Sequence, residues 1–172
     1  AASDVYKRQA LCSVGILNAH AENVAIAKSS LVGDGIVEFV PQGFDQTKTP
    51  SLILKEEPTA KGSVPSDWEL YPQFTVVDGK ANASLSLTGE ISLYGGGEVT
   101  GPLLRNGQYI KLWNTDTGAY GVDGGKRLYQ SHPWVLGVRR DGSAFGILFD
   151  SSWKSELHTN SDKIEFNTEG AL

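Results

Sequence analysis

The stretch from Trp134 to Phe149, WVLGVRRDGSAFGILF, decides the fold class, because it consists of two short apolar segments joined by a polar turn. The segments Trp134–Val138 and Ala144–Phe149 have the length of β-strands, and the residues between them include Asp141-Gly142. An Asp-Gly pair between two such segments is a strong signal for a β-hairpin, because the tight turn needs residues that accept a positive φ. The stretch therefore predicts two antiparallel strands.

The second segment also alternates between the two faces of a strand. Ile147 and Phe149 are expected on one face, and Gly146 and Leu148 on the other, because successive side chains of a strand point in opposite directions. The same period of two marks further strand candidates along the chain, which are Ile36–Val40, Phe74–Val76 and Leu85–Leu87 on either side of Asp78-Gly79, Tyr109–Trp113, and Lys163–Phe166.

The chain has 172 residues, a length typical of one domain. From Glu22 onward, no window of helical length holds apolar residues at i, i+3, i+4 and i+7. Short strands joined by Gly, Asp and Asn turns are typical of antiparallel sandwiches and barrels. We therefore predict a single all-β domain, an antiparallel β-sandwich.

Composition excludes several classes of function. The formal net charge is -5 without any basic block, which argues against nucleic acid or an anionic membrane surface as a partner. No apolar run approaches the roughly 20 residues that span a bilayer. The chain holds one Cys, and His132 and His158 have no metal-ligand spacing to another His or Cys. We expect neither a metal nor a cofactor.

The two ends of the chain differ in character from the rest. Residues 1–9, AASDVYKRQ, resemble the translation of a sequencing-library adaptor, and residues 10–21, ALCSVGILNAHA, resemble the end of a secretory signal peptide with cleavage after Ala21. The alternative for residues 10–21 is a first core strand or helix. The expected domain therefore covers residues 22–172 of a secreted or periplasmic protein, and we expect its last strand or strands to be missing after Leu172.

A glycine-rich stretch, LYGGGEVTGPLL, runs from Leu93 to Leu104. It matches neither GxGxxG nor GxxxxGK[ST], and Pro102 stands where a helix would begin, so a phosphate-binding loop is excluded. We instead expect Gly95–Gly97 to form a tight bend or bulge where the backbone approaches another element.

The segment YIKLWNTDTGAYGVD, residues 109–123, brings an aromatic ring, an amide and carboxylates close together in sequence. Flat aromatic faces pack on the C–H face of a pyranose, and Asp and Asn bind vicinal hydroxyls, so the segment fits sugar recognition. The alternative is that Trp113 belongs to the core while Asn114 and Asp116 shape an Asx turn, which is the commoner use of such residues in loops.

Four motifs in the same order make the chain from about Gly35 onward resemble the N-terminal domain of glycoside hydrolase family 31, the α-glucosidases and α-xylosidases. They are LYGGGEVTGPLL, LWNTD, LYQSHPW and DGSAFGILFDSSW. The resemblance implies a galactose-mutarotase-like β-sandwich, in agreement with the period-two pattern. It also implies that a (β/α)₈ barrel follows, which carries both catalytic aspartates of a retaining mechanism. We therefore expect no catalytic residue in this chain and no activity from it alone.

The resemblance further implies that a loop of the form W/F-N-x-D reaches the mouth of the barrel, where its Asp contacts hydroxyls of the bound sugar. Here that residue is Asp116. Trp113, Asn114 and Tyr129 are secondary candidates, expected to hold the loop more than to touch the sugar. The expected partners are an α-linked oligosaccharide or glycoside and the missing barrel.

Two other functions stay open at this point. The chain could be a stand-alone carbohydrate-binding sandwich, because fold alone does not separate such a module from a glycosidase domain. A free-standing mutarotase would need a His base and a carboxylic acid in one cleft, and the sequence around His132 and His158 gives little support for that.

Overall fold

The computed structural model describes residues 23–25, 27–42, 59–116, 118–120, 123–170 and 172. The interpretations of residues 1–9 as an adaptor translation and of residues 10–21 as a leader lie outside the described residues. Within the described part, regular structure is β except for one 3-10 turn at Gly118–Tyr120, and no helix there is long and apolar enough to cross a membrane. The prediction of an all-β chain is confirmed.

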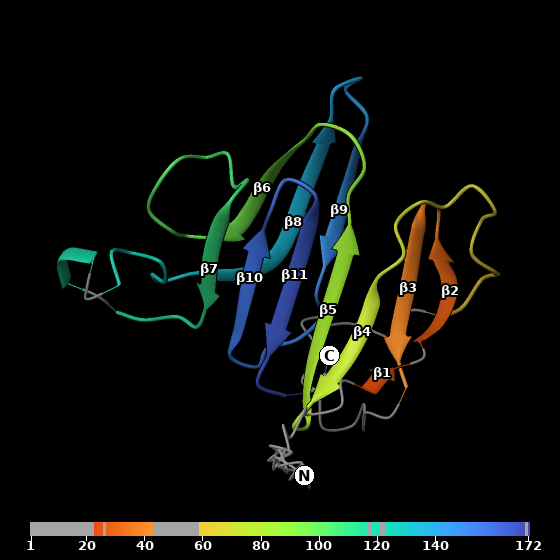
Figure 1. Cartoon of the computed structure of the whole chain (residues 1–172), viewed down its shortest axis with the longest axis horizontal. Helices are drawn as coiled ribbons and strands as arrows, with labels where there is room; N and C mark the ends of the chain where they lie inside the picture. The colour runs from red at the N-terminus through yellow and green to blue at the C-terminus, as the bar shows by residue number, and fades with distance from the viewer. Residues whose placement is uncertain (1–22, 26, 43–58, 117, 121–122, 171) are drawn as a thin grey trace, which may run out of the picture.

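The larger sheet contains six antiparallel strands in the order β1-β4-β5-β11-β10-β7. Their bounds are β1 Asn23–Ala25, β4 Gln73–Val77, β5 Lys80–Ser86, β7 Gln108–Leu112, β10 Ser155–Thr159 and β11 Lys163–Thr168. This sheet forms one layer of the molecule (Figure 1).

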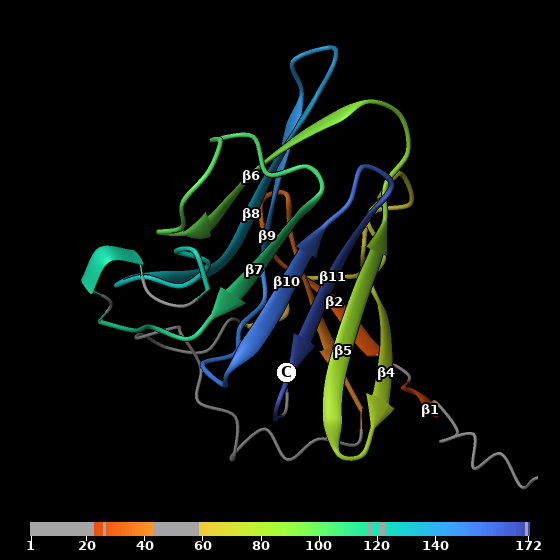
Figure 2. The ribbon, with the colours of Figure 1, turned by 60° about the vertical axis from the view of Figure 1, so that its left-hand side comes forward.

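A three-stranded antiparallel sheet of order β6-β8-β9 and a β2-β3 hairpin make up the rest. Their bounds are β2 Ala27–Gly33, β3 Ile36–Pro41, β6 Ile91–Gly97, β8 Ser131–Arg139 and β9 Ala144–Leu148. Figures 1 and 2 show β6, β8 and β9 lying behind the larger sheet as a second layer. The architecture is the antiparallel sandwich that the sequence predicts.

The core lies between the two layers. Phe149, just after β9, stacks on Phe166 of β11 with ring centroids 4.5 Å apart and planes 3° from parallel, so one pair of rings joins the layers. Alternate residues of each strand complete this core, because period-two patterning sends them to the same side. The buried hydrophobic cluster is Phe74, Ala83, Leu85, Leu87, Ile91, Leu93, Ile110, Leu112, Val135, Phe149, Leu157, Ile164 and Phe166.

The two hairpins predicted from Asp-Gly pairs are both present. Asp78 and Gly79 between β4 and β5 have φ of 51° and 76°, so both turn positions are left-handed as expected. In the β8–β9 turn only Gly142 of the Asp-Gly pair is left-handed, with a φ of 87°. Asp141 there accepts hydrogen bonds from the Ser143 backbone N, at 2.9 Å, and hydroxyl, at 2.7 Å, and so closes the turn with its side chain.

Strand β11 is longer than its sequence pattern predicted. The expected strand ended at Phe166, whereas β11 continues through Thr168. Asn167 pairs with both Asn82 and Glu156, and Thr168 is buried, so neighbouring strands on both sides extend the ladder beyond the apolar residues. The pairing with two neighbouring strands therefore outweighs the preference of Asn167 for turns. Whether a further strand follows Leu172 stays a prediction.

The expected bend at Gly95–Gly97 is confirmed. All three glycines are left-handed, with φ of 111°, 80° and 87°, and the register between β6 and β8 shifts between Gly95 and Gly97. A Cβ on Gly97 would lie less than 3.0 Å from the backbone of Gln130 and His132. All three glycines are therefore required for their backbone conformation, and Gly95 and Gly97 also for the close approach of β8.

Replacing Gly97 with Ala tests this requirement. Gly97→Ala is expected to lower the free energy of unfolding by about 2–4 kcal/mol, because the new Cβ meets rigid backbone and φ stays positive. Gly62→Ala is the control, since a Cβ at Gly62 meets nothing within 4 Å. Urea denaturation followed by circular dichroism measures both; equal effects of the two substitutions would show that the bend tolerates a side chain.

The outer face of the three-stranded sheet is apolar. Trp134, Leu136 and Leu148 are 45%, 37% and 45% exposed there, and the register pairs Trp134 with Leu148 and Tyr94 with Leu136. These side chains point away from the core, on the opposite face from Val135 and Phe149. A cluster of large apolar side chains in water promotes association.

We expect the isolated chain to self-associate as its concentration rises, through this apolar face. Leu136→Lys places a charge at its centre and is expected to reduce the association, as measured by static light scattering over a concentration series. Ser66→Lys adds the same charge at an exposed position outside the face and is expected to change little. A monodisperse wild-type monomer at all concentrations would contradict the prediction.

Candidate functional site

The four predicted site residues lie on the connection between β7 and β8, residues 113–130, and the described part of this loop extends beyond the edge of the sandwich (Figure 2). Backbone hydrogen bonds hold its two ends together: Lys111 N donates to Lys126 O at 3.3 Å, and Thr115 N donates to Leu128 O at 2.9 Å. Leu128 is buried and anchors the returning segment. The start and the end of this loop therefore run side by side.

The segment that follows β6 supports the loop from another direction. Glu98 N donates to Gln130 O at 2.8 Å, and Thr100 N donates to Gly125 O at 3.0 Å. The Thr100 hydroxyl also donates to Gly124 O at 2.5 Å. The glycine bend directs residues 98–100 along the returning segment, so the LYGGGEVTGPLL motif serves as a support for the loop.

Asp116 and Tyr129 each follow directly after a residue of the Thr115–Leu128 hydrogen bond, and they lie close together. Asp116 is exposed, and Tyr129 is 55% exposed. The pKa of the Tyr129 hydroxyl is raised above its ordinary value by the charge of Asp116 and by a hydrogen bond between the two side chains, with a smaller contribution from Glu98. A carboxylate accepts this bond and the phenol donates it. Asp116 thus presents its carboxylate to solvent beside a hydroxyl donor.

Trp113 and Asn114 lie at the beginning of the loop and are both exposed. The alternative that Trp113 belongs to the core is wrong, because β7 ends at Leu112 and the Trp113 side chain is 49% exposed. The Trp113 carbonyl accepts a hydrogen bond from the Thr115 hydroxyl at 3.2 Å, which shapes the first turn of the loop. Among the described residues, the structure pairs neither the Trp113 nor the Asn114 side chain with Asp116.

A second polar cluster, which the sequence did not reveal, covers the outer face of β7 and β10. The Tyr109 hydroxyl donates to Glu156 Oε1, and the Tyr109 ring lies 4.7 Å from that of His158. Lys111 and Lys126 place their Nζ atoms 5.9 Å and 5.4 Å from the same ring. Burial and then the hydrogen bond to Glu156 raise the pKa of Tyr109 to about 12. Cross-strand pairing of β7 with β10 could have indicated this cluster, once their register was known.

Next to this cluster, Arg127 Nε donates to Asp123 Oδ2 at 2.6 Å. This bond holds the pKa of Asp123 below its usual range, and the charge of Lys111 adds to the effect. Asp123 is therefore committed to an ion pair at the base of the loop. Within the described part of the chain, no group of three or more His, Cys, Asp and Glu side chains could hold a metal ion.

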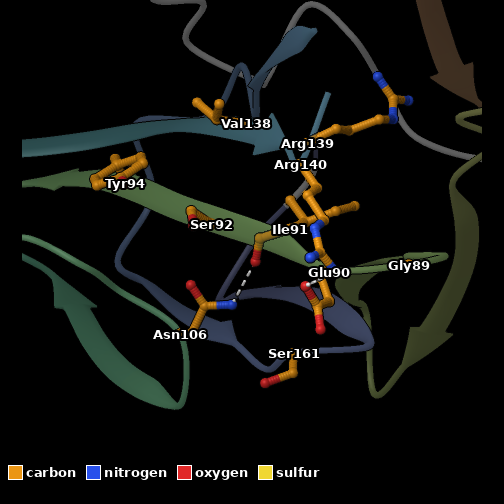
Figure 3. A pocket seen from close by; sticks show the side chains of 10 residues that line it. All are labelled: Gly89, Glu90, Ile91, Ser92, Tyr94, Asn106, Val138, Arg139, Arg140 and Ser161. Carbon is orange, nitrogen blue, oxygen red and sulfur yellow. Dashed lines mark hydrogen bonds and ion pairs between the residues drawn. The ribbon is translucent and has the colours of Figure 1, made fainter. Parts of the chain in front are cut away.

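A shallow pocket lies between the β5–β6 and β8–β9 turns, and none of the four predicted residues lines it (Figure 3). Asn106 braces it by donating to Ile91 O and accepting from Leu93 N, both at 2.8 Å. Glu90 and Arg140 form an exposed ion pair at 3.4 Å across its rim. The polar side chains of Asn106, Glu90 and Arg140 therefore bind other groups of the chain, which is typical of a structural contact. The pocket is lined by Gly89, Glu90, Ile91, Ser92, Tyr94, Asn106, Val138, Arg139, Arg140 and Ser161.

Comparison with known proteins identifies the family to which this domain belongs. Residues 29–157 match the glycosyl hydrolase 31 N-terminal galactose mutarotase-like domain. The chain therefore belongs to this family of domains, as its four motifs predicted.

Three longer proteins that are similar to this chain have names that describe glycosidases. Alpha-glucosidase 2 of Bacillus thermoamyloliquefaciens is 34% identical over 160 residues, which cover 86% of this chain and 20% of the relative. A family 31 alpha-glucosidase structure from Bacteroides thetaiotaomicron is 68% identical over 55% of this chain and 16% of its own, with a TM-score of 0.49. The glucose complex of the Flavobacterium johnsoniae dextranase FjDex31A is 20% identical, covers 87% of this chain and 24% of its own, and has a TM-score of 0.62, which supports the fold. The chain spans about a fifth of these relatives.

The Tyr109 cluster predicts a pH dependence of stability. Because folding raises the pKa of Tyr109 from 10.0 to about 12, its contribution is fully present below pH 10 and is lost as the pH rises toward 12. Tyr109→Phe is expected to remove this part of the fall in unfolding free energy, measured by urea denaturation between pH 9 and about pH 11.5. Tyr71→Phe, outside the cluster, is expected to keep it. Identical pH profiles for wild type and Tyr109→Phe would exclude the effect.

Proposed function

We propose that this chain is the N-terminal domain of a secreted or periplasmic retaining α-glycosidase that hydrolyses α-glucosides or α-xylosides. The observation that carries the proposal is Asp116, an exposed carboxylate on a braced loop in a chain of this family. The domain contributes that loop to the active site of the (β/α)₈ barrel that follows. Residues 10–21 act as the leader for export.

In this arrangement the barrel performs the bond cleavage. Two carboxyl groups about 5–5.5 Å apart act there, one attacking the anomeric carbon and one transferring the proton. Asp116 instead accepts hydrogen bonds from hydroxyls of the sugar at the cleavage point. Charge-assisted bonds of this kind are about twice as strong as neutral ones, so the carboxylate fixes the sugar relative to the reacting groups.

The aromatic side chains have a supporting role. The exposed Trp113 ring offers a flat apolar face to the C–H side of a pyranose, while Asn114 and Tyr129 hold the loop. Because the proposal places both catalytic carboxylates in the barrel, the chain alone is expected to be inactive. The net charge of -5 without a basic block fits a neutral carbohydrate better than nucleic acid or an anionic membrane.

Asp116→Ala in the longer protein tests the site. The substitution is expected to lower kcat/KM for p-nitrophenyl α-glucoside by about 10- to 100-fold, because a charged hydrogen-bond partner of the substrate is lost. The thermal stability is expected to stay nearly unchanged, since Asp116 is exposed. Asp67→Ala, at another exposed Asp, is the control. Unaltered kinetics would show that Asp116 does not take part in substrate binding.

Two observations distinguish the glycosidase domain from the alternative function, a stand-alone carbohydrate-binding module. A reading frame that continues downstream into repeated βα units with an Asp at a strand end supports the glycosidase. A stop codon within a few dozen residues, together with calorimetric binding of maltose by the isolated chain, would instead support the binding module.

A further inference from the structure

Glu98 holds the backbone around Tyr129 in place. It is the first residue after the glycine bend, and its backbone N donates to Gln130 O at 2.8 Å. Its side-chain Oε2 accepts a hydrogen bond from Tyr129 N at 3.2 Å. One residue therefore binds two consecutive residues of the returning segment, one through its backbone and the other through its carboxylate.

Tyr129 in turn faces the start of the loop. The bond from Thr115 N to Leu128 O, at 2.9 Å, joins the residues that directly precede Asp116 and Tyr129, so the two backbone segments are adjacent at this point. The side-chain hydrogen bond between them and the electrostatic influence of Asp116 on the phenol agree with this placement. A continuous series of contacts thus leads from the β6 bend through Glu98 and Tyr129 to Asp116.

We propose that Glu98 and Tyr129 are positioning residues, which hold the Asp116 carboxylate in the orientation that binds sugar hydroxyls. Glu98 fixes the backbone of Tyr129, and the Tyr129 hydroxyl donates to Asp116. This proposal rests on the function proposed above for Asp116. It gives a role to the Glu of the LYGGGEVTGPLL motif.

The chemistry of the three groups fits these roles. An ionised carboxylate offers about four acceptor positions, so one bond from a phenol leaves capacity for two neighbouring hydroxyls. The phenol carries its proton at neutral pH, because the ordinary pKa of tyrosine is about 10 and that of Tyr129 is raised above it, so the phenol is a donor. A carboxylate already held by one bond loses less rotamer freedom when the sugar binds, which favours affinity.

The contacts are tested first in the isolated chain, by NMR of ring-labelled tyrosine and of backbone amides. Asp116→Asn is expected to lower the pKa of the Tyr129 phenol, because the negative charge next to it is removed. Glu98→Gln retains an acceptor oxygen, whereas Glu98→Ala is expected to accelerate exchange of the Tyr129 amide hydrogen about tenfold or more. Glu90→Gln and Glu90→Ala, at an exposed carboxylate outside this network, are the controls. An unchanged Tyr129 pKa and amide exchange would overturn the proposal.

The functional role is tested in the longer protein with p-nitrophenyl α-glucoside. Tyr129→Phe and Glu98→Ala are each expected to lower kcat/KM about 3- to 10-fold, less than Asp116→Ala does. Because they act through Asp116, the double variant Asp116→Ala/Tyr129→Phe is expected to be no slower than Asp116→Ala alone. Glu98→Gln is expected to restore part of the loss.

The outcomes separate the two proposals. If Asp116→Ala lowers kcat/KM while Tyr129→Phe and Glu98→Ala do not, or if the effects of Asp116→Ala and Tyr129→Phe add fully, the positioning roles are excluded and the function of Asp116 stands. If Asp116→Ala has no effect, the function proposed for Asp116 fails, and with it the positioning roles.

Discussion

The close approach of β6 and β8 at Gly95–Gly97 is the constraint on which the rest of the loop region depends. Three consecutive left-handed residues shift the register of the two strands and bring β6 so near to β8 that a Cβ on Gly95 or Gly97 would overlap its backbone. Left-handed backbone costs an L-residue about 1–2 kcal/mol, and glycine avoids that cost. The bend releases the chain from the sheet at a fixed point and in a fixed direction, so the residues that follow meet the loop between β7 and β8.

That loop combines a rigid base with an exposed tip. Its ends are tied by backbone hydrogen bonds to each other and to residues 98–100, and Leu128 is buried beneath it. The chemical groups above this base, Trp113, Asp116 and Tyr129, stay in contact with solvent. Functional side chains on loops gain precision when a scaffold holds the backbone. Here the sandwich supplies the scaffold, and the polar cluster around Tyr109 belongs to the same support, because Lys126 and the Asp123–Arg127 pair connect it to the loop base.

Local patterns in the sequence predicted part of the strands, but they did not predict β1, β2, β6 or β10, nor the contacts between strands. Alternation predicted the β8–β9 hairpin and the faces of Ile147 and Phe149, and Asp78-Gly79 predicted a left-handed turn, because these features depend on neighbouring residues. The length of β11 could not be predicted, since Asn167 is held in the strand by Asn82 and Glu156, both distant in sequence. The exposure of Trp113 was left open for a similar reason: nothing local tells whether the strand ends before or after it. The pairing of Glu98 with Tyr129, 31 positions apart, follows only from the register of β6 and β8.

The aromatic side chains divide between the interior and the surface in a way that affects spectroscopy. Among the residues that the structure describes, the buried aromatics are Phe74, Phe149 and Phe166, whereas Trp113, Trp134 and Trp153 are between 44% and 49% exposed and Trp68 is half-buried. Indole emission from this chain therefore arises from rings that already contact water in the folded state. The same distribution makes Trp113, three residues before Asp116, a built-in fluorophore for any ligand that docks on the loop, while far-ultraviolet dichroism is the suitable signal for the fold itself.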